Sequence, residues 1–166
     1  MGYAYRYDTK LGTFTIAESG KGITDIDLST SLDGLPKDCE EKETPLLAQA
    51  AKQLREYFDG ARTEFDLPLD PVGTEFQKRV WEQLRRIPYG ETRTYRQIAE
   101  AADCPKGYRA VGLANNRNRI IIAVPCHRVI GSDGSMTGFG GGIDIKEELL
   151  RFENSGGTCE IKRLRD

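Results

Sequence analysis

Polar and apolar residues alternate along the beginning of the chain as they do in half-buried strands, whose successive side chains point to opposite faces of a sheet. This period of two is found in residues 3–7, 12–17 and 23–28. Glycine-containing segments at 10–12 and 20–22 separate these stretches, as tight turns between neighbouring strands do. We therefore expect an antiparallel meander, followed by a polar surface loop over residues 29–43.

A helical period begins at Thr44. The hydroxyl of Thr44 can cap a helix, Pro45 suits its first position, and apolar residues then recur every three or four positions as far as Phe58. Gly60 is the expected end of this helix. The segment 62–71 carries two prolines and fits either a last strand or a linker into the second half. The first 70 residues thus predict a domain built from an antiparallel sheet and one helix.

Residues 71–166 predict a second, mostly helical domain. Thr74 can cap a helix that ends before Pro88, because proline cannot continue the ladder of backbone hydrogen bonds. Thr94, with a glutamine three residues later, has the capping-box pattern of a short helix. A second short helix over 108–115 would complete a helix-turn-helix of the winged-helix kind. The fold class is therefore α+β, within the broad α/β class, with two domains.

The charges are distributed unevenly along the chain. Residues 1–70 carry 8 basic and 14 acidic side chains, a net charge of −6, whereas residues 71–130 carry 11 basic and 5 acidic ones, a net charge of +6. A local basic region can bind nucleic acid even in a chain whose overall net charge is −2. The basic region coincides with the predicted helix-turn-helix, so the two observations together favour DNA as a partner.

The composition argues against several classes of protein. No apolar run reaches the roughly 20 residues that span a bilayer, and no basic segment followed by an apolar one opens the chain, so we expect a soluble cytoplasmic protein. The 4 cysteines have no C-x-x-C spacing and there is 1 histidine, so we expect no metal site and no cofactor. Whether Cys39, Cys104 and Cys159 are buried thiols or form a disulfide is open.

The candidate chemistry lies at Cys126 and His127, because a histidine beside a cysteine can favour the reactive thiolate. The apolar run 120–124 leads into this pair and is expected to be a buried extended segment. Adjacent residues of a regular strand point to opposite faces, so the two side chains can cooperate only if the backbone turns or a water molecule bridges them. Pro125 favours such a turn. Taken alone, however, such a pair is more often an inert buried cysteine beside a surface histidine.

The order and spacing of several segments change this interpretation. These segments are Tyr89–Tyr95, Arg109–Gly112, Pro125–Ile130, Gly138–Gly142 and Lys146–Glu153. Together they resemble the O6-alkylguanine-DNA alkyltransferase family, the methylated-DNA–protein-cysteine methyltransferases, over residues 71–154. The Pro-Cys-His-Arg block at 125–128 is the most specific element of the resemblance. The first 70 residues carry no such motif but are compatible with the variable amino-terminal domain of that family.

The resemblance implies a DNA repair protein that transfers the alkyl group from O6 of guanine to its own cysteine, once and irreversibly. Cys126 would be the alkyl acceptor, and His127 would take the thiol proton through a water molecule. Glu153 would orient His127, and the hydroxyl of Tyr95 would hydrogen-bond the guanine. The base must leave the duplex, since O6 of a stacked guanine cannot reach a buried thiol.

The resemblance also implies residues that contact DNA and residues that surround the flipped base. Arg109, a long cation among very small side chains, would fill the gap left in the duplex, and Asn118 would tie the recognition helix to the active-site segment. The residues assigned to DNA binding are Thr94, Arg109, Ala110, Gly112, Asn118 and Arg128. The residues assigned to the substrate pocket are Val129 and Gly140, through main-chain groups, and Phe139 in the glycine-rich loop 132–142.

Some features depart from the family pattern. Phe139 stands where family members often have tyrosine, and the glycines at 140–142 can widen the pocket, so the range of alkyl groups accepted is open. Repair of O4-alkylthymine is open as well. The zinc ligands of some vertebrate members cannot be supplied here by a single histidine in the active site. The expected partner is duplex DNA containing O6-alkylguanine, bound by a monomer without metal or cofactor.

Three alternatives use the same residues differently. An alkyltransferase-like sensor binds the lesion without repairing it, but such proteins replace the cysteine that is present here as Cys126. A cysteine hydrolase would use Cys126, His127 and Glu153 and leave Arg109 unexplained. A helix-turn-helix regulator that reads sequence in the major groove would leave the Pro-Cys-His-Arg block without a purpose.

Overall fold

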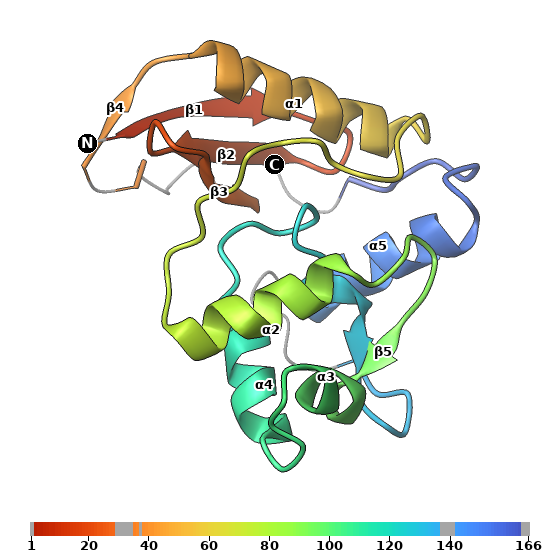
Figure 1. The fold of residues 1–166 in the computed structure, drawn as a ribbon. Coiled ribbons are helices and arrows are strands. Elements are labelled where there is room, and N and C mark those ends of the chain that lie inside the picture. Colours follow the sequence, from red (N-terminus) through yellow and green to blue (C-terminus); the bar gives the residue numbers. More distant parts are fainter. Residues whose placement is uncertain (1, 29–34, 37, 137–141, 164–166) are drawn as a thin grey trace.

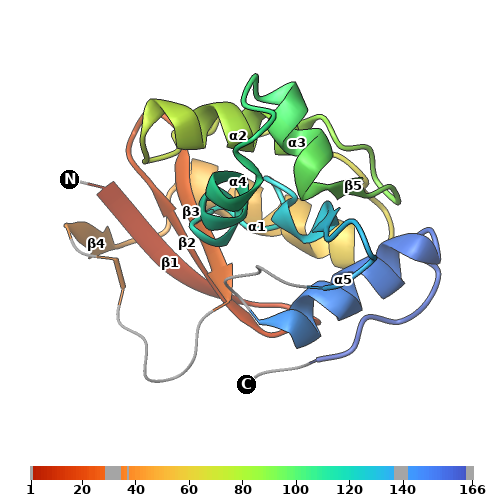
Figure 2. The ribbon, with the colours of Figure 1, turned by 90° about the horizontal axis from the view of Figure 1, so that it is seen from below.

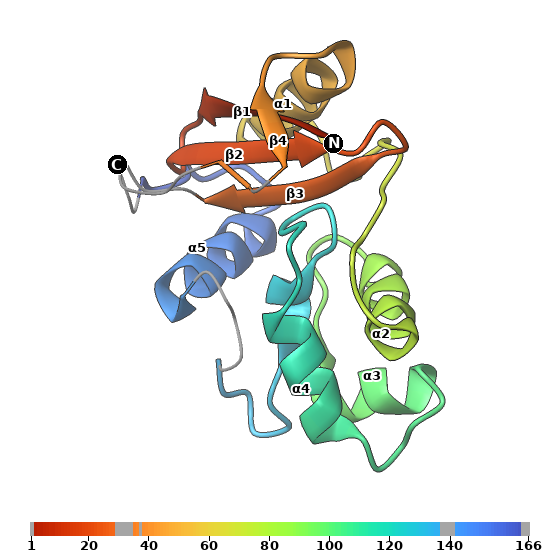
Figure 3. The same cartoon turned by 90° about the vertical axis from the view of Figure 1, so that its left-hand side faces the viewer.

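The computed structural model of the chain describes residues 2–28, 35–36, 38–136 and 142–163. Figure 1 shows a sheet with one long helix above it and a group of helices below it. In Figure 2, which is seen from below, the helices of the second half lie nearer the viewer than the strands, and the side view in Figure 3 separates the sheet from these helices. The predicted α+β fold, with a sheet first and a helical part second, is confirmed.

The sheet has four strands in the order β3-β2-β1-β4. They are β1 (Gly2–Asp8), β2 (Thr13–Glu18), β3 (Ile23–Leu28) and β4 (Cys39–Glu41). The first three form the predicted antiparallel meander. The fourth pairs with β1 in parallel, so the sheet is mixed, and part of the predicted surface loop is an edge strand. Its sequence, Cys-Glu-Glu, does not alternate between apolar and polar residues. The strand lies at the edge of the sheet and is held by backbone pairing, so it needs no buried apolar face.

The helix α1 (Pro45–Phe58) covers one face of this sheet. Its start is the predicted one, since the Thr44 hydroxyl accepts a hydrogen bond of 3.2 Å from the backbone N–H of Leu47. The helix ends just before Gly60, which adopts a φ of +76°. A side chain there would meet the backbone of Gly157 at 2.3 Å, so both the left-handed turn and the close approach require glycine.

Capping boxes begin the first two helices of the second half; both threonine caps were predicted, but the full capping box was predicted at Thr94 alone. Thr74 caps α2 (Glu75–Arg85) and Thr94 caps α3 (Tyr95–Ala101), each with its glutamine three residues later. The helix-turn-helix is completed by α4 (Tyr108–Asn116). The indole N–H of Trp81 donates to the Ala114 carbonyl at 2.8 Å and fixes α2 against α4.

The segment 120–130, the candidate active-site segment, lies beside this helix-turn-helix. It contains a 3₁₀ helix, η1 (Cys126–Arg128), followed by β6 (Val129–Ile130), which pairs in parallel with β5 (Arg93–Thr94) at the start of α3. The last helix, α5 (Ile143–Asn154), packs against η1. The β5–β6 pairing thus brings two segments that are far apart in the sequence to one place.

The two halves share one core. A single cluster of buried apolar side chains extends from the sheet and α1 into the helices of the second half. Backbone hydrogen bonds also cross the junction: Ile26 of β3 donates to Arg119 at 2.9 Å and accepts from Ile121 at 3.0 Å. The segment 62–71 acts mainly as a linker, with one short bridge from Leu69 to β3. Within the described ranges, no helix is both long and apolar enough to span a bilayer.

Candidate active site around Cys126

The chain reaches Cys126 through two three-residue turns. They are centred on Ile122 and Pro125 and are closed by backbone hydrogen bonds of 2.9 and 2.8 Å. Ile122 has a φ of +74°, which a β-branched residue rarely adopts, so the run 120–124 is buried as predicted but bent where an extended segment was expected. The 3₁₀ helix follows at once and carries both Cys126 and His127 in the interior. The backbone therefore turns at Cys126 and His127, which is the condition predicted from the sequence for cooperation of these two side chains.

Glu153 on α5 accepts hydrogen bonds from three buried side chains. His127 places Nε2 2.7 Å from Oε2, and Arg128 donates from Nε to Oε1 at 2.8 Å and from Nη2 to Oε2 at 2.9 Å. The Tyr57 hydroxyl, from α1, donates to Oε2 at 2.5 Å. Burial alone would raise the pKa of Glu153, but the charges and hydrogen bonds of His127 and Arg128 outweigh burial and hold this pKa far below its usual range. The carboxylate is therefore ionised at neutral pH.

The hydrogen bond to Glu153 determines which nitrogen of His127 carries the proton. An ionised carboxylate only accepts, so Nε2 is the N–H donor and Nδ1 holds the free lone pair of the neutral ring. Nδ1 is buried and has no hydrogen-bond partner among the described residues. Burial lowers the pKa of His127, although Glu153 opposes this effect. A neutral ring with an available Nδ1 can act as a base.

The Cys126 thiol is held in its neutral form. Burial raises its pKa to about 11, and a hydrogen bond from Asn118 and the charge of Lys146 only partly offset this. Very little thiolate therefore forms at neutral pH without a base that takes the proton. His127, the next residue, is the nearest base in the sequence.

Lys146 is buried on α5 with its ammonium group beside Tyr95. Its Nζ lies 3.5 Å from the Tyr95 hydroxyl oxygen and 5.7 Å from the centre of the ring. Burial lowers the pKa of Lys146 to about 8, against the effect of Cys126, which raises it. The site thus holds a cation with a readily released proton between a phenol and a thiol.

Two asparagines connect α4 and its end to the active-site segment. The Asn118 side chain donates to the Val124 carbonyl at 2.8 Å and accepts from the Ile120 backbone N–H at 3.0 Å. The buried Asn115 donates to the Cys126 carbonyl at 3.3 Å. These three bonds stabilise the tight turns that a free chain would not adopt.

The outer face of α4 is well placed to meet a large partner. Arg109 and Ala110 are exposed on its first turn, Leu113 is 54% exposed, and Gly112 faces the Tyr95 ring. This face therefore leads from solvent to Tyr95, the tyrosine predicted to contact the base. In the part of the chain that the structure describes, no three His, Cys, Asp or Glu side chains are grouped to hold a metal ion.

Both halves of the chain match a known family. Residues 75–155 match the "6-O-methylguanine DNA methyltransferase, DNA binding domain", and residues 2–71 match the "ribonuclease-like domain" of the same protein. The chain belongs to the 6-O-methylguanine DNA methyltransferase family. The resemblance inferred from the second half is thereby confirmed, and membership extends to the first half, where the sequence carries no recognisable motif.

Relatives of known name agree with this assignment. The chain is 49% identical to the "Methylated-DNA--protein-cysteine methyltransferase" of Methanosarcina barkeri over 89% of its length and 94% of the relative's. It is 48% identical to the constitutive protein of that name from Bacillus subtilis, over 92% and 96% of the two lengths. The structure titled "Crystal structure of Mycobacterium tuberculosis OGT in complex with DNA" is 43% identical and superposes with a TM-score of 0.85, over 95% and 96% of the two chains. The expected enzyme class, a methylated-DNA–protein-cysteine methyltransferase, is confirmed.

One residue assigned to DNA binding lies in the wrong place for that role. The guanidinium of Arg128 is buried, with two bonds to Glu153 and one of 2.7 Å to the Ile87 carbonyl. Each of its three nitrogen atoms donates to a partner inside the protein, and a buried carboxylate needs such a cation nearby. We therefore reassign Arg128 from the DNA-binding set to the carboxylate network of this family member.

The remaining predicted residues fall into two groups. Thr94 uses its hydroxyl to cap α3, and Val129 is buried in β6, so a DNA or base contact of either stays a prediction. Phe139 and Gly140 lie outside the described residues. All four cysteines are free thiols, so no disulfide joins Cys39, Cys104 and Cys159.

Sequence reasoning missed three residues of the site. They are Tyr57, Asn115 and Lys146. Lys146 and Asn115 lie inside segments that resemble or adjoin the family motifs, yet a lysine on a helix is ordinarily a surface residue. Tyr57 has the spacing of an ordinary core residue on α1, and nothing in the sequence near it points to a carboxylate 96 positions away.

Proposed function

We propose that this protein repairs DNA by moving an alkyl group from O6 of a guanine in duplex DNA onto Cys126, in a single irreversible turnover. The observation that supports this most directly is the Glu153–His127 hydrogen bond of 2.7 Å. It holds the only histidine in the chain as a neutral base, immediately next to a buried cysteine that needs one.

In the proposed reaction His127 begins the transfer. Its Nδ1 takes the thiol proton of Cys126 through a water molecule, and the imidazolium that forms is stabilised by Glu153. The sulfur then attacks the alkyl carbon, a new S–C bond forms, and the C–O6 bond breaks with its electron pair going to the guanine. The thioether that results has no leaving route, so each protein acts once.

The departing guanine needs stabilisation of its negative charge. The Tyr95 hydroxyl donates a hydrogen bond or a proton to it, and Lys146, 3.5 Å from that hydroxyl, favours the anionic forms of both the phenol and the base. The lowered pKa of Lys146, about 8, suits a group that replaces the phenol proton at neutral pH. Guanine therefore leaves as a neutral base.

Access to the buried thiol requires extrusion of the base. Arg109 stands exposed at the start of α4, and the small side chains of Ala110 and Gly112 let the helix approach a narrow groove closely. We propose that Arg109 occupies the gap in the duplex while the base reaches Tyr95. The net charge of +6 over residues 71–130 favours this contact with the phosphate backbone.

We also propose that residues 1–70 and 71–166 are two domains that work as one monomer inside the cell. Every side chain used in the mechanism comes from one chain, so a second copy is not needed. The shared core keeps the two domains in a constant relation.

The mass of the intact protein after incubation with duplex DNA containing O6-methylguanine tests the proposal. We expect the gain of one methyl group per chain, mapped to Cys126 and saturating at one equivalent. Lesion binding without any gain in mass would favour the sensor. Release of product from ester or amide substrates over many turnovers would favour the hydrolase.

A further inference from the structure

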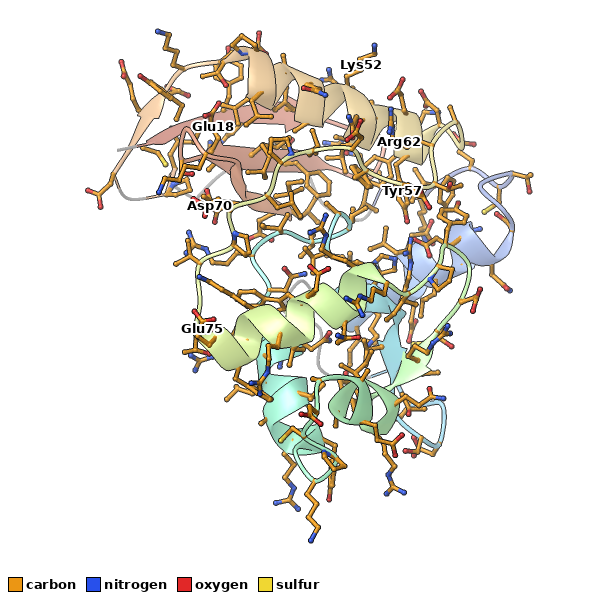
Figure 4. All side chains as sticks on the ribbon, in the orientation of Figure 1. Glu18, Lys52, Tyr57, Arg62, Asp70 and Glu75 are labelled. Atoms are coloured by element: carbon orange, nitrogen blue, oxygen red, sulfur yellow. The ribbon has the colours of Figure 1, made fainter. Side chains whose placement is uncertain are left out.

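The hydrogen bonds to Glu153 come from both halves of the chain. His127, Arg128 and the backbone N–H of Gly90 belong to the second half, whereas Tyr57 belongs to α1 in the first. The labelled Tyr57 in Figure 4 lies between α1 and the second half, on the side of α5. We propose that Tyr57 is a positioning residue for alkyl transfer, whose hydroxyl holds the Glu153 carboxylate in the orientation that aligns His127. This inference rests on the proposed function.

The surroundings of Tyr57 fix the direction of its hydroxyl. The ring is fully buried, and its centre lies 5.4 to 6.0 Å from the centres of four other aromatic rings. These rings are Phe58, Phe65, Tyr89 and Phe152. Phenylalanine would fill the same space, so packing by itself does not explain a hydroxyl here. The hydroxyl has one described partner, the carboxylate of Glu153 at 2.5 Å.

The Tyr57 hydroxyl and the His127 ring bind the same oxygen atom of Glu153. Oε2 of Glu153 accepts from Tyr57 at 2.5 Å, from His127 at 2.7 Å and from Arg128 at 2.9 Å. Burial and the carboxylate raise the pKa of Tyr57, so it stays a neutral O–H donor throughout the working range. A neutral donor on Oε2 withdraws negative charge from the atom that supports the imidazolium. Tyr57 therefore sets both the orientation of the carboxylate and the basicity of His127.

Other titratable or charged groups also face the His127–Glu153 pair, and their protonation states must stay constant in a test. They are Tyr89 after α2, Cys126 and Arg128 on η1, and Lys146 on α5. None of them donates to Tyr57 in the described structure, so Tyr57→Phe removes one donor and leaves their charges unchanged. A change in the titration of His127 can then be assigned to that donor.

The experiment follows the ring signals of His127 by NMR as the pH is varied. The chain has a single histidine, so the assignment is unambiguous. Tyr7→Phe is the matched control, because the Tyr7 hydroxyl also donates to a glutamate, Glu43 at 2.8 Å, far from the site. We expect Tyr57→Phe to raise the pKa of His127 by about half a pH unit or more, because Oε2 becomes a stronger base. The control should titrate like the wild type.

The rate of alkyl transfer is measured in the same variants with free O6-benzylguanine, per chain able to react. We expect a loss of about tenfold in Tyr57→Phe, with its pH midpoint moved in step with the NMR titration, and no loss in Tyr7→Phe. A purely structural role would lower the reactive fraction without moving that midpoint. An unchanged midpoint in Tyr57→Phe would overturn the proposal.

A second variant covers the case in which Tyr57→Phe does not fold. A 3-fluorotyrosine placed at position 57 keeps the ring and makes the hydroxyl a stronger donor, so the pKa of His127 should fall. No shift in either direction would contradict the coupling. The titration needs no alkyl donor, so a wild-type protein that takes up no alkyl group would contradict the proposed function and not the link between Tyr57 and His127.

Discussion

The two ends of the Cys126–His127 pair lie in opposite electrostatic environments. On one side, Glu153 receives donors from three side chains, and its pKa is held far below the usual range. On the other side, burial raises the pKa of Cys126 to about 11, and the cation nearby, Lys146, has a pKa lowered to about 8. The first environment stabilises a charge, and the second disfavours one.

This difference separates the two tasks of the site. The carboxylate end is preorganised before any substrate arrives, so His127 is a neutral base of defined tautomer. The thiol end stays neutral until a base removes its proton, which would protect the proposed single-use nucleophile. Variants that act on one end and spare the other can test this separation.

The largest effect is expected from Cys126→Ala. Transfer should disappear completely, while binding to duplex DNA containing O6-methylguanine should persist, because the proposed DNA-binding surface on α4 is untouched. Intact-protein mass and a DNA titration measure the two properties. A methyl group found on another cysteine would place the acceptor elsewhere.

Glu153→Gln should disrupt the preorganised end. Arg128 would keep a buried charge without its carboxylate, so the free energy of unfolding should fall by about 3–5 kcal/mol, and transfer should slow by about a hundredfold or more. Urea denaturation and the rate with free O6-benzylguanine give the two values. A rate near the wild-type value in the folded fraction would show that His127 does not depend on the carboxylate.

Arg109→Ala changes neither the Glu153 end nor the Cys126 end of the site, so it should affect only the entry of the flipped base. Repair of duplex DNA should fall by about 10- to 100-fold, because extrusion of the base costs a few kcal/mol, whereas reaction with free O6-benzylguanine should not change. Parallel rate measurements on the two substrates decide the point. Equal losses on both would contradict the extrusion role.

Lys146→Met should make the protein more stable but slow alkyl transfer at the thiol end. Lys146 is fully buried, and below pH 8 it is charged in both the folded and unfolded states, so methionine should stabilise the fold at pH 7 by about 1–3 kcal/mol. The gain should shrink as the pH rises from about 8 toward the unfolded pKa of about 10.4. Transfer should slow by about tenfold. Urea midpoints at pH 7 and pH 10 test the expected sign, and a destabilised variant at pH 7 would contradict it.

The smallest effect is the pH dependence that comes from His127. Its pKa is lowered in the folded state by burial, so its contribution to stability is present above the unfolded pKa of about 6.5 and declines as the pH falls below that value. Transfer from free O6-benzylguanine should continue below pH 6.5 for the same reason. Comparison with His127→Gln, which lacks this titration, isolates the effect; identical slopes of stability against pH would refute it.

Local chemistry explains why several elements could be predicted. Thr44, Thr74 and Thr94 each satisfy backbone donors within three residues, so their helices begin where the sequence indicates. Of the helix-turn-helix, α3 was predicted from its cap, whereas α4 has no side-chain cap and was predicted from the spacing of its apolar residues. β4 was missed because its pairing with β1 involves backbone atoms alone. α5 was not predicted from its pattern, since its N-terminus has no side-chain cap.

The sequence predicted the place of some residues of the candidate site correctly and of others not, and the difference has a physical reason. Cys126, His127, Glu153 and Tyr95 could be named because the resemblance covers their segments, and the structure brings His127 onto Glu153 and Tyr95 beside Lys146. Arg128 was assigned to the wrong surface, because an arginine in a basic region looks the same in sequence whether it faces DNA or a buried carboxylate.

The sequence by itself determined the starts of α1, α2 and α3, the first three strands, the basic region and the family, because each depends on residues that are close together along the chain. Only the tertiary structure decided that Tyr57 from α1 and Arg128 from η1 meet at Glu153, and that Lys146 is buried. Contacts between residues as much as 96 positions apart leave no periodic pattern. The shared core that brings them together forms only when both halves fold as one.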